Sequence, residues 1–339
     1  MNELSLFDGM SCGQIALNRI GVKPSTYYAS ELDKYAIKVT QANYPDTVQL
    51  GDVTQWREWD IDWASIDLLI GGSPCQGFSF AGKQLAFDDP RSKLFFVYVD
   101  ILNHIKSVNP NIKFMLENVK MKKEYLAVIS ERLGVEPVFI NSALVSAQNR
   151  RRYYWCNWDV AQPEDKGIVL ADVLEKEVDE KYFLSEKLLN GFIAKQKRRK
   201  EKKSGFDNLA VVDLNGKSPT ITGRYHKTAM SDPVIMLRPR GNNKGGGRAL
   251  NGKTPSLTSN SFEHNAILAV AGTYRRFTPI ECERLQGVED NYTNHVSNTQ
   301  RYKMLGNGWT VDVIAHIFSQ MQVPISLLSR QLDLFGEAA

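Results

Sequence analysis

Short apolar runs alternate with amphipathic stretches over the first 158 residues of the chain. The apolar runs predict strands at residues 3–8, 25–30, 47–51, 66–71, 112–117, 135–144 and 152–158. Helical periodicity predicts helices between them, at residues 13–20, 34–43, 92–107 and 122–133. Strands and helices in alternation indicate an α/β fold with a mostly parallel sheet covered on both faces. Such sheets bind ligands at the carboxyl ends of their strands.

The pattern changes after about residue 160. Residues 196–205 read QKRRKEKKSG and are strongly basic, whereas residues 207–270 are rich in Gly, Asn, Ser, Thr and Pro. Within that part LNGKSPTIT (214–222) returns as LNGKTPSLT (250–258), which predicts two matched turn-and-strand units framing the loop LRPRGNNKGGGRA (237–249). Helical periodicity resumes near residue 277, and we expect this last part to pack back onto the first.

The composition is that of an ordinary globular protein, with 42% hydrophobic residues and a net charge of +4 that permits nucleic-acid binding without requiring it. No apolar run reaches the roughly 18 residues of a membrane span, and the opening MNELSLFDGM does not have the pattern of a signal peptide. We therefore expect a cytoplasmic protein. The four cysteines have no paired spacing, which predicts free thiols and neither a disulfide framework nor a metal site. Cys12, Cys156 and Cys282 are interpreted as small buried hydrophobic residues.

The segment LSLFDGMSCGQIAL (4–17) predicts a strand, a tight turn and the start of a helix. Gly9 and Gly13 allow the backbone to approach a ligand closely. Glu31 ends the second predicted strand, where a carboxylate can accept hydrogen bonds from a ribose diol, and Asp52 follows the third, where it can accept from an adenine amino group. A full GxGxxG is absent, so an adenosyl cofactor is favoured over a dinucleotide.

The segment GGSPCQGFSFAGKQ (71–84) follows the fourth predicted strand and carries Cys75. A thiolate is the best side-chain nucleophile near neutral pH, and this edge of the sheet is where the architecture places chemistry. The residues after Cys75, with Ser79 and Lys83 among glycines, predict a polar loop suited to contact with nucleic acid.

Charged side chains follow on the neighbouring strands. Glu117 ends the fifth predicted strand, beside Cys75, where a carboxyl group in a closed site can share a proton with a reacting ring. In QNRRRYYW (148–155) strand alternation places Gln148, Arg150 and Arg152 on one face. Guanidinium groups there can hold a ring oxygen, the glutamate or a phosphate.

These segments together resemble the cytosine-5 DNA methyltransferase family, and the resemblance covers nearly the whole chain. The motifs of the family occur here in order: FDGMSCG, Glu31, Asp52, Pro-Cys-Gln, Glu117-Asn118-Val119, Gln148-x-Arg150-x-Arg152, RRFTPIECERLQG and GNGWTVDVI. The opening and closing motifs look more like those of the animal de novo enzymes and their phage and bacterial relatives.

The resemblance implies a class I, Rossmann-like methyltransferase fold that uses S-adenosyl-L-methionine and carries a smaller target-recognition domain. The expected division is a catalytic and cofactor-binding domain at 1–160, a target-recognition domain at 161–272, helices completing the catalytic domain at 273–325 and a tail at 326–339.

The resemblance also implies roles for individual residues. Cys75 would attack C6 of a cytosine flipped out of duplex DNA, Glu117 would engage its N3 and amino group, and Arg152 would contact O2; Arg150 is counted with this catalytic set. The residues expected to bind S-adenosylmethionine are Phe7, Asp8, Gly9, Met10, Gly13, Glu31, Leu32, Asp52, Val53, Pro74 and Asn307. The residues expected to contact DNA are Gln76, Ser79, Lys83, Arg238, Arg240, Asn242, Lys244 and Arg248.

Three alternatives stay open at this point. The tRNA-methylating branch of the same family carries a Cys-Phe-Thr triplet that is absent here. A catalytically inert DNA-binding regulator is disfavoured by the intact Pro74-Cys75-Gln76 triplet and Glu117. A nicotinamide oxidoreductase is disfavoured by the missing GxGxxG. The DNA sequence that is methylated, and the role in restriction-modification, anti-restriction or regulation, are not specified by the sequence.

Two further segments carry expectations. The basic run 196–205 predicts a sequence-independent phosphate contact, or alternatively a solvated helix face. Gln331, Leu332, Asp333, Leu334 and Phe335 resemble the short peptide by which bacterial proteins dock on the DNA sliding clamp, although these apolar side chains can instead anchor the chain on the first domain. We expect a monomer, from a bacterial or phage-infected cell.

Overall fold

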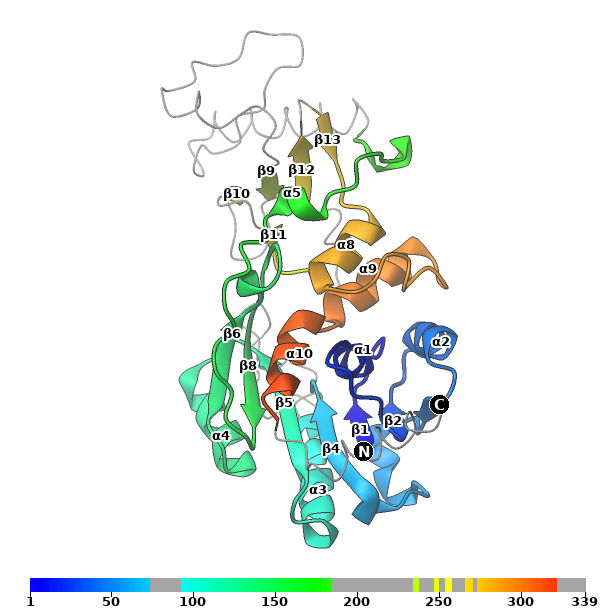
Figure 1. The fold of residues 1–339 in the computed structure, drawn as a ribbon, viewed down its shortest axis with the longest axis vertical. Helices are drawn as coiled ribbons and strands as arrows, with labels where there is room; N and C mark the ends of the chain where they lie inside the picture. Colours follow the sequence, from blue (N-terminus) through cyan, green and yellow to red (C-terminus); the bar gives the residue numbers. More distant parts are fainter. Residues whose placement is uncertain are drawn as a thin grey trace, which may run out of the picture. The chain divides into compact units, whose positions relative to one another are not determined.

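The computed structural model describes residues 1–73, 93–184, 234–237, 247–249, 254–257, 266–270 and 273–321. The chain divides into two compact units. The first unit comprises residues 1–141, 151–164 and 308–339, and the second comprises residues 142–150 and 165–307. Figure 1 shows the described elements, coloured from blue to red along the sequence.

The described part of the first unit is built on a seven-stranded sheet with the order β3-β2-β1-β4-β5-β8-β6. Its strands are β1 (Asn2–Leu6), β2 (Thr26–Ser30), β3 (Val48–Gln49), β4 (Ile66–Gly71), β5 (Lys113–Val119), β6 (Pro137–Asn141) and β8 (Arg151–Cys156). The pairs from β3 to β5 are parallel, and β8 runs antiparallel to both of its neighbours. The predicted α/β class with a mostly parallel sheet is therefore confirmed.

Four helices of the first unit lie close to their predicted positions: α1 (Cys12–Arg19), α2 (Lys34–Asn43), α3 (Lys93–Val108) and α4 (Lys123–Leu133). The described part of the unit also contains α10 (Val311–Ser319), in the region where helical periodicity resumes. Although α10 is almost 300 residues from α1 in the sequence, the two pack together (Figure 1). Arg19 also pairs with Asp312 at 3.1 Å. The expectation that the last part of the chain packs onto the first is confirmed for α10.

The sheet core explains why these segments form strands. Leu4, Leu69, Phe114, Leu116 and Trp155 are each no more than 1% exposed and belong to one apolar cluster. Inner strands of a parallel sheet are buried on both faces, so they read as nearly continuous apolar runs. Strand β1 departs from this rule, because Glu3 and Ser5 are also completely buried.

Two predicted strands differ from the observed ones. The run 135–144 forms β6 only as far as Asn141, and Ser142–Leu144 forms a 3-10 turn. The segment 148–155 is not one alternating strand, because Gln148–Asn149 forms β7, Arg151–Cys156 forms β8, and the two lie in different units. Gln148 and Arg152 therefore do not share a strand face.

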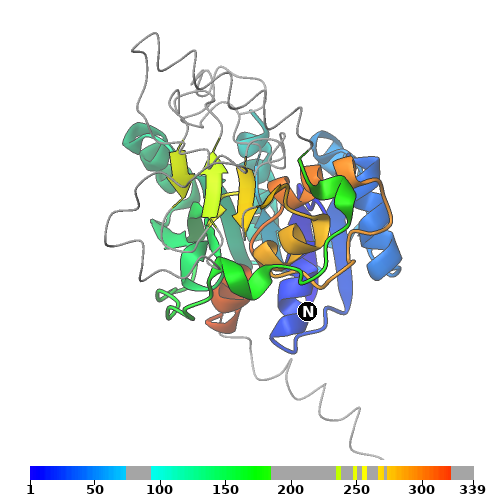
Figure 2. The ribbon, with the colours of Figure 1, turned by 90° about the horizontal axis from the view of Figure 1, so that it is seen from above.

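The second unit contains an antiparallel sheet with the order β10-β9-β12-β13 in its described part (Figure 2). These strands are β9 (Val234–Leu237), β10 (Gly247–Ala249), β12 (Ala266–Val270) and β13 (Thr273–Arg275). Strands β9 and β10 pair from Leu237 with Gly247 to Ile235 with Ala249, on either side of the loop between them. The first repeat, 214–222, lies outside the described residues, so the predicted framing by the two repeats stays a prediction. Part of the second repeat forms β11 (Thr254–Pro255), which pairs with β7.

The described part of this unit also contains the helices α5 (Leu170–Val173), α8 (Pro279–Gln286) and α9 (Asn298–Asn307). The bounds of α8 follow directly from its sequence. Thr278 and Glu281 form a capping box around Pro279, and Gly287 ends the helix with φ of 69°. No helix in the described part of the chain is long and apolar enough to cross a membrane.

Candidate functional site

The turn after β1 has an unusual backbone. Phe7, Gly9 and Ser11 all have positive φ, of 60°, 63° and 64°, which only glycine adopts without steric cost. Glu31 holds the turn in this shape, because its Oε2 accepts a hydrogen bond from the Gly9 N–H at 2.7 Å. Among the residues that the structure describes, no atom outside the turn lies within 4 Å of where a Cβ on Gly9 would be, which leaves room for a ligand on this side of the turn.

Glu31 lies at the carboxyl end of β2. Its Oε1 accepts from the N–H groups of Leu32 and Asp33, both at 2.7 Å, in addition to the bond from Gly9 to Oε2. A carboxylate has about four lone-pair sites, so it retains capacity for a further donor such as a ribose hydroxyl. The neighbouring Leu32 is 69% exposed and forms an apolar surface beside Glu31.

Asp52 follows β3, which is the parallel neighbour of β2. The Thr54 N–H and hydroxyl both donate to Asp52 Oδ1 at 2.9 Å, which caps the 3-10 turn Val53–Glu58. The Ser30 hydroxyl donates to the carbonyl of Gly51 at 2.7 Å and ties the two strand ends together. The structure thus brings Glu31 and Asp52 to the same edge of the sheet, as predicted.

Asp8 faces inward from the same turn. Its oxygens accept hydrogen bonds from the hydroxyls of Tyr27 at 2.7 Å and Ser11 at 2.9 Å. Burial raises the pKa of Asp8 to about 6, against the opposing effect of these hydroxyl donors. Asp8 therefore stabilises the turn from the inside through these two hydrogen bonds.

The remaining predicted cofactor residues have different surroundings. Met10 and Val53 have buried side chains, so only their backbone can face a ligand. A Cβ on Gly13 would lie 2.3 Å from Ile70 Cδ1, and glycine at this position therefore allows α1 to pack on the sheet. Asn307 is exposed at the end of α9 in the second unit.

Glu117 lies in β5 with 8% of its surface exposed. Its Oε1 is 2.8 Å from Arg152 Nε, an ion pair that is close without hydrogen-bond alignment. Its Oε2 accepts a hydrogen bond from the indole Nε1 of Trp309 at 3.1 Å. The structure therefore brings together the predicted Glu117 and Arg152, and adds Trp309, which the sequence analysis did not single out.

Asn118 connects this strand to the segment that precedes Cys75. Its Nδ2 donates to Ser73 Oγ at 3.2 Å, and its Oδ1 accepts from the N–H of Val119 at 2.8 Å. Residues 74–92 lie outside the described part, so the structure does not place Pro74, Cys75, Gln76, Ser79 and Lys83. Arg238, Arg240, Asn242, Lys244 and Gln331, Leu332, Asp333, Leu334, Phe335 lie outside it as well, and Arg248 is described only in its backbone.

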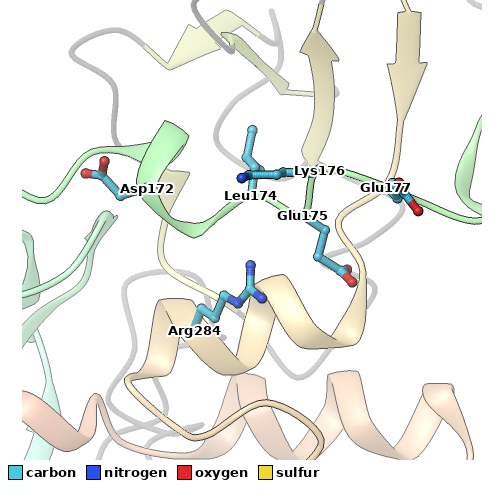
Figure 3. Close-up of a pocket in the computed structure, with 6 residues that line it drawn as sticks. All are labelled: Asp172, Leu174, Glu175, Lys176, Glu177 and Arg284. Carbon is cyan, nitrogen blue, oxygen red and sulfur yellow. The ribbon is translucent and has the colours of Figure 1, made fainter.

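A surface hollow on the second unit contains none of the predicted site residues. It is lined by Asp172, Leu174, Glu175, Lys176, Glu177 and Arg284 (Figure 3). Its acidic and basic side chains are mixed and include no thiol nucleophile. Among the residues that the structure describes, no group of three or more His, Cys, Asp or Glu side chains is arranged to hold a metal ion.

Comparison with known proteins gives the family. Residues 1–323 match the model of the C-5 cytosine-specific DNA methylases. The chain belongs to this family. It is 31% identical to the Type II methyltransferase M.NlaX of Neisseria lactamica, over 96% of this chain and 97% of that protein. It is 30% identical to M1.ScrFI of Lactococcus lactis subsp. cremoris, over 94% of this chain and 77% of that one.

Solved structures with low sequence identity share the fold. The methyltransferase EhMeth of Entamoeba histolytica matches with a TM-score of 0.63 and 18% identity, over 94% of this chain and 97% of that one. The Dnmt2 methyltransferase of S. pombe matches with a TM-score of 0.58 and 16% identity, over 98% and 99% of the two chains. The predicted family, the methyltransferase fold and the enzyme class, DNA (cytosine-5)-methyltransferase, are confirmed, which excludes the nicotinamide oxidoreductase.

In this C-5 cytosine-specific DNA methylase, Gln148 and Arg150 hold the backbone of the second unit. Gln148 Oε1 accepts from the N–H of Leu257 at 2.8 Å, and Arg150 Nη1 donates to the carbonyl of the same residue at 2.8 Å. Arg150 Nη2 also donates to the carbonyl of Gly306 at 3.2 Å, and its side chain is buried. These two side chains therefore fix the second sequence repeat, in which Leu257 lies.

The other cysteines of the methylase are buried and therefore do not have the exposure of a catalytic nucleophile. Cys12, Cys156 and Cys282 are buried thiols, as predicted. Burial raises the pKa of the Cys156 thiol, which disfavours its reactive thiolate form. Cys12 Sγ lies 3.7 Å from the backbone carbonyl of Trp309, so it packs where the first and last motifs of the family meet.

Proposed function

We propose that this DNA (cytosine-5)-methyltransferase acts through a covalent bond between Cys75 and C6 of a cytosine flipped out of duplex DNA. The observation that carries the proposal is the arrangement of Glu117. Its carboxylate is held by Arg152 and Trp309, and the adjacent Asn118 is bonded to Ser73, two residues before Cys75. Strand ends β4 and β5 are neighbours, which supports a nucleophile and a carboxyl group in one site.

The residues at the ends of β1, β2 and β3 fit an adenosyl cofactor, S-adenosyl-L-methionine. The open side of Gly9 allows close approach, Glu31 retains acceptor capacity for a ribose diol, and Asp52 can accept from an adenine amino group. The exposed Leu32 offers apolar contact, whereas Met10 and Val53 contribute backbone groups. When bound, this cofactor supplies the electrophilic methyl group.

The residues of the chain then divide the work on the cytosine. The Cys75 thiolate forms a bond to C6, while the Glu117 carboxyl group donates a proton or hydrogen bond at N3 and takes up the negative charge that develops in the ring. Arg152 contacts O2 and Glu117 together. After C5 has gained the methyl group, a base removes the C5 proton, the C6–S bond breaks and the thiolate leaves.

We assign duplex DNA as the substrate and the second unit, with its loop between β9 and β10, as the recognition unit. Arg150 then acts as a positioning residue that holds the recognition unit through Leu257, and Arg152 remains in the catalytic set. Flipping a base costs a few kcal/mol, which contacts to the DNA from Gln76, Ser79 and Lys83 would offset. A pairing with the bacterial sliding clamp through Gln331–Phe335 stays a prediction, as do the monomeric state and the role in restriction-modification.

The test uses the Cys75→Ser variant of the full chain. Methyl transfer to duplex DNA should fall by about 10⁴-fold or more, as for loss of other enzymatic nucleophiles, while cofactor binding stays within a factor of about two. The wild type should form a covalent adduct with DNA that contains 5-fluorocytosine, because fluorine at C5 cannot leave as a proton.

The controls separate the rival functions. The Cys156→Ser variant, at a buried thiol, should keep adduct formation. Transfer to tRNA instead of duplex DNA would favour the tRNA-methylating branch, and a wild type that binds DNA without transfer would favour an inert regulator. Full activity of Cys75→Ser would overturn the assignment of the nucleophile.

A further inference from the structure

Trp309 lies in the GNGWTVDVI segment, directly before α10, and its indole contacts the glutamate of the proposed site. The Nε1–H donates to Glu117 Oε2 at 3.1 Å. Both side chains are almost completely buried, Trp309 at 9% exposed and Glu117 at 8%. The main chain of Trp309 is also held in place, because its carbonyl oxygen lies 3.7 Å from Cys12 Sγ.

Gly72, three residues before Cys75, packs directly against this pair. A Cβ at Gly72 would lie 2.9 Å from Trp309 Nε1 and 3.1 Å from Glu117 Oε2. These distances leave no space for a side chain, so glycine at this position lets the strand end approach the hydrogen bond. The end of β4, the end of β5 and the start of α10 therefore meet at one carboxylate oxygen.

The chemistry of the two partners restricts where Glu117 can carry a proton. An indole nitrogen and a guanidinium are donors only, so neither can accept a hydrogen bond from the O–H of a neutral carboxyl group. Trp309 occupies Oε2 and Arg152 lies at Oε1. A proton on Glu117 must therefore lie on a lone pair that faces neither partner.

From this arrangement we propose that Trp309 is a positioning residue: its N–H holds Glu117 in the rotamer that aims the carboxyl proton at the N3 position of the bound cytosine. This rests on the role proposed above for Glu117. The indole does not itself touch the reacting atoms.

The test compares Trp309→Phe with wild type in steady-state and single-turnover methylation of duplex DNA. Phenylalanine keeps an aromatic ring and removes the N–H donor together with part of the indole, a loss of ring volume that the control variant below shares. We expect kcat to fall by about 10- to 100-fold, the range for loss of a hydrogen bond to a charged group, with KM for DNA and for cofactor changed less than about threefold. The matched control is Trp158→Phe, which removes an indole bond to the carbonyl of Ile317 (3.1 Å) in the same unit and should leave kcat unchanged.

A double-mutant cycle with Glu117→Gln separates positioning from packing. If Trp309 acts through the carboxyl group, Trp309→Phe should add almost nothing to the loss in the Glu117→Gln background. Equal losses in both backgrounds would show that Trp309 only packs, and unchanged kcat in the single variant would also overturn the inference. Should Glu117→Gln be too slow to assay, adduct formation with 5-azacytosine DNA provides the same comparison, because this ring is more electrophilic at C6 and should reduce the Trp309→Phe loss.

The activity of Glu117→Gln alone separates the role of Glu117 from the role of Trp309. Full activity of that variant would overturn the role of Glu117 and the proposed function of this site. An impaired Glu117→Gln together with a fully active Trp309→Phe would overturn only the inference about Trp309.

Discussion

At the scale of single residues, Glu3 is the side chain that fits its surroundings least. It lies in the central strand β1 with no exposed surface, and neither of its carboxylate oxygens has a hydrogen-bond partner among the residues that the structure describes. Burial raises the pKa of Glu3 well above its ordinary value, and the nearby charge of Asp8 raises it further. Glu3 therefore favours the neutral form in the folded protein.

This predicts a pH-dependent gain in stability for Glu3→Gln. A carboxyl group with a raised pKa in the folded protein makes its full contribution to folding stability below the unfolded pKa of about 4.3. This contribution is lost as the pH rises toward the folded pKa, because in that range the unfolded chain ionises while the folded chain stays neutral. The variant should therefore gain stability relative to wild type by up to about 1.4 kcal/mol for each pH unit in that window. Urea denaturation at pH 5 and pH 8 measures the difference.

The control for this prediction is the exposed Glu131 in α4, where Glu131→Gln should show no such trend. A constant difference between Glu3→Gln and wild type at both pH values would mean that Glu3 is ionised or paired in the fold. Methylation activity should be retained, since Glu3 is not among the residues assigned to the cofactor or the cytosine.

Residue roles could be predicted where position along a strand decides them. Glu31, Asp52 and Glu117 were all placed correctly, because a parallel sheet brings its carboxyl ends to one edge. Trp309 could not be predicted, since its contact with Glu117 joins residues 192 apart and no local pattern signals it. The packing role of Gly13 was missed for the same reason, because Ile70 meets it from a different strand.

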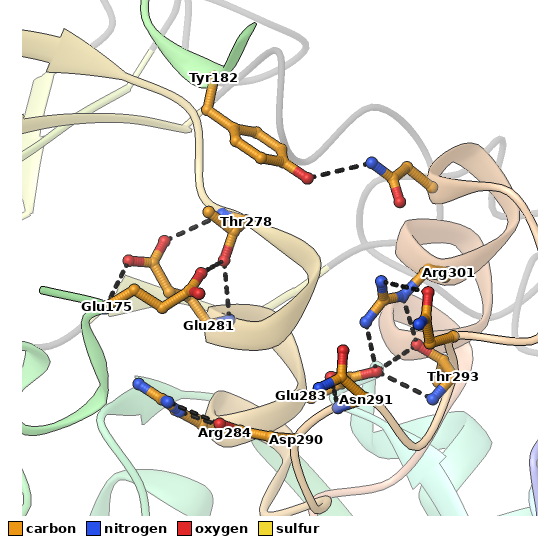
Figure 4. Close-up of polar contacts among 12 residues, drawn as sticks. Glu175, Tyr182, Thr278, Glu281, Glu283, Arg284, Asp290, Asn291, Thr293 and Arg301 are labelled. Carbon is orange, nitrogen blue, oxygen red and sulfur yellow. Dashed lines mark hydrogen bonds and ion pairs between the residues drawn. The ribbon is translucent and has the colours of Figure 1, made fainter. Parts of the chain in front are cut away.

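At the scale of elements, α8 carries two completely buried glutamates. Glu281 pairs with Arg275 at 2.6 Å. Glu283 pairs with Arg301 of α9 at 2.9 Å (Figure 4). Glu283 also accepts from the N–H groups of Asn291 at 2.8 Å and Thr293 at 2.9 Å. These charges are satisfied by several donors, which is the condition under which burial of an ion pair is tolerated.

We predict that Arg301→Met destabilises the protein by about 3–5 kcal/mol, because it leaves the Glu283 charge buried without its cation. Arg284 on the same helix is the matched control. Its partner Asp290 is 2.6 Å away, but the two side chains are 33% and 42% exposed, so Arg284→Met should cost about 1 kcal/mol or less. Chemical denaturation of both variants measures the two values, and equal losses would contradict the prediction.

Element boundaries could be predicted where caps and breakers are local. The helices α2 and α8 follow from their side-chain caps, and β4 was predicted at its observed bounds. In the segment 148–155, strand alternation was expected to place Gln148, Arg150 and Arg152 on one face. The segment is divided because Gln148 and Arg150 form their hydrogen bonds with Leu257, a residue more than 100 positions later, which no local pattern reveals.

At the scale of the whole molecule, a modest net charge of +4 has to serve both sequence recognition and phosphate binding. The residues predicted to act in catalysis and cofactor binding lie mostly in the first unit where the structure describes them, with Arg150 and Asn307 in the second. The segments richest in arginine and lysine outside the first unit are the loop between β9 and β10 and the run 196–205. We expect these two segments to contribute differently, since base contacts specify sequence and phosphate contacts supply salt-dependent affinity.

The last prediction tests this division with Arg240→Ala. A bidentate arginine contact to guanine O6 and N7 is worth about 1–3 kcal/mol of discrimination, so its loss should relax or change the methylated sequence by about 5- to 100-fold at one base position. Bisulfite sequencing of a plasmid methylated by each variant measures this. Arg199→Ala, in the basic run, should instead lower methylation evenly at all sites and flatten the salt dependence of DNA binding. An even loss with Arg240→Ala would assign that loop to phosphate contacts, because a phosphate carries no sequence information and its loss cannot favour one base over another.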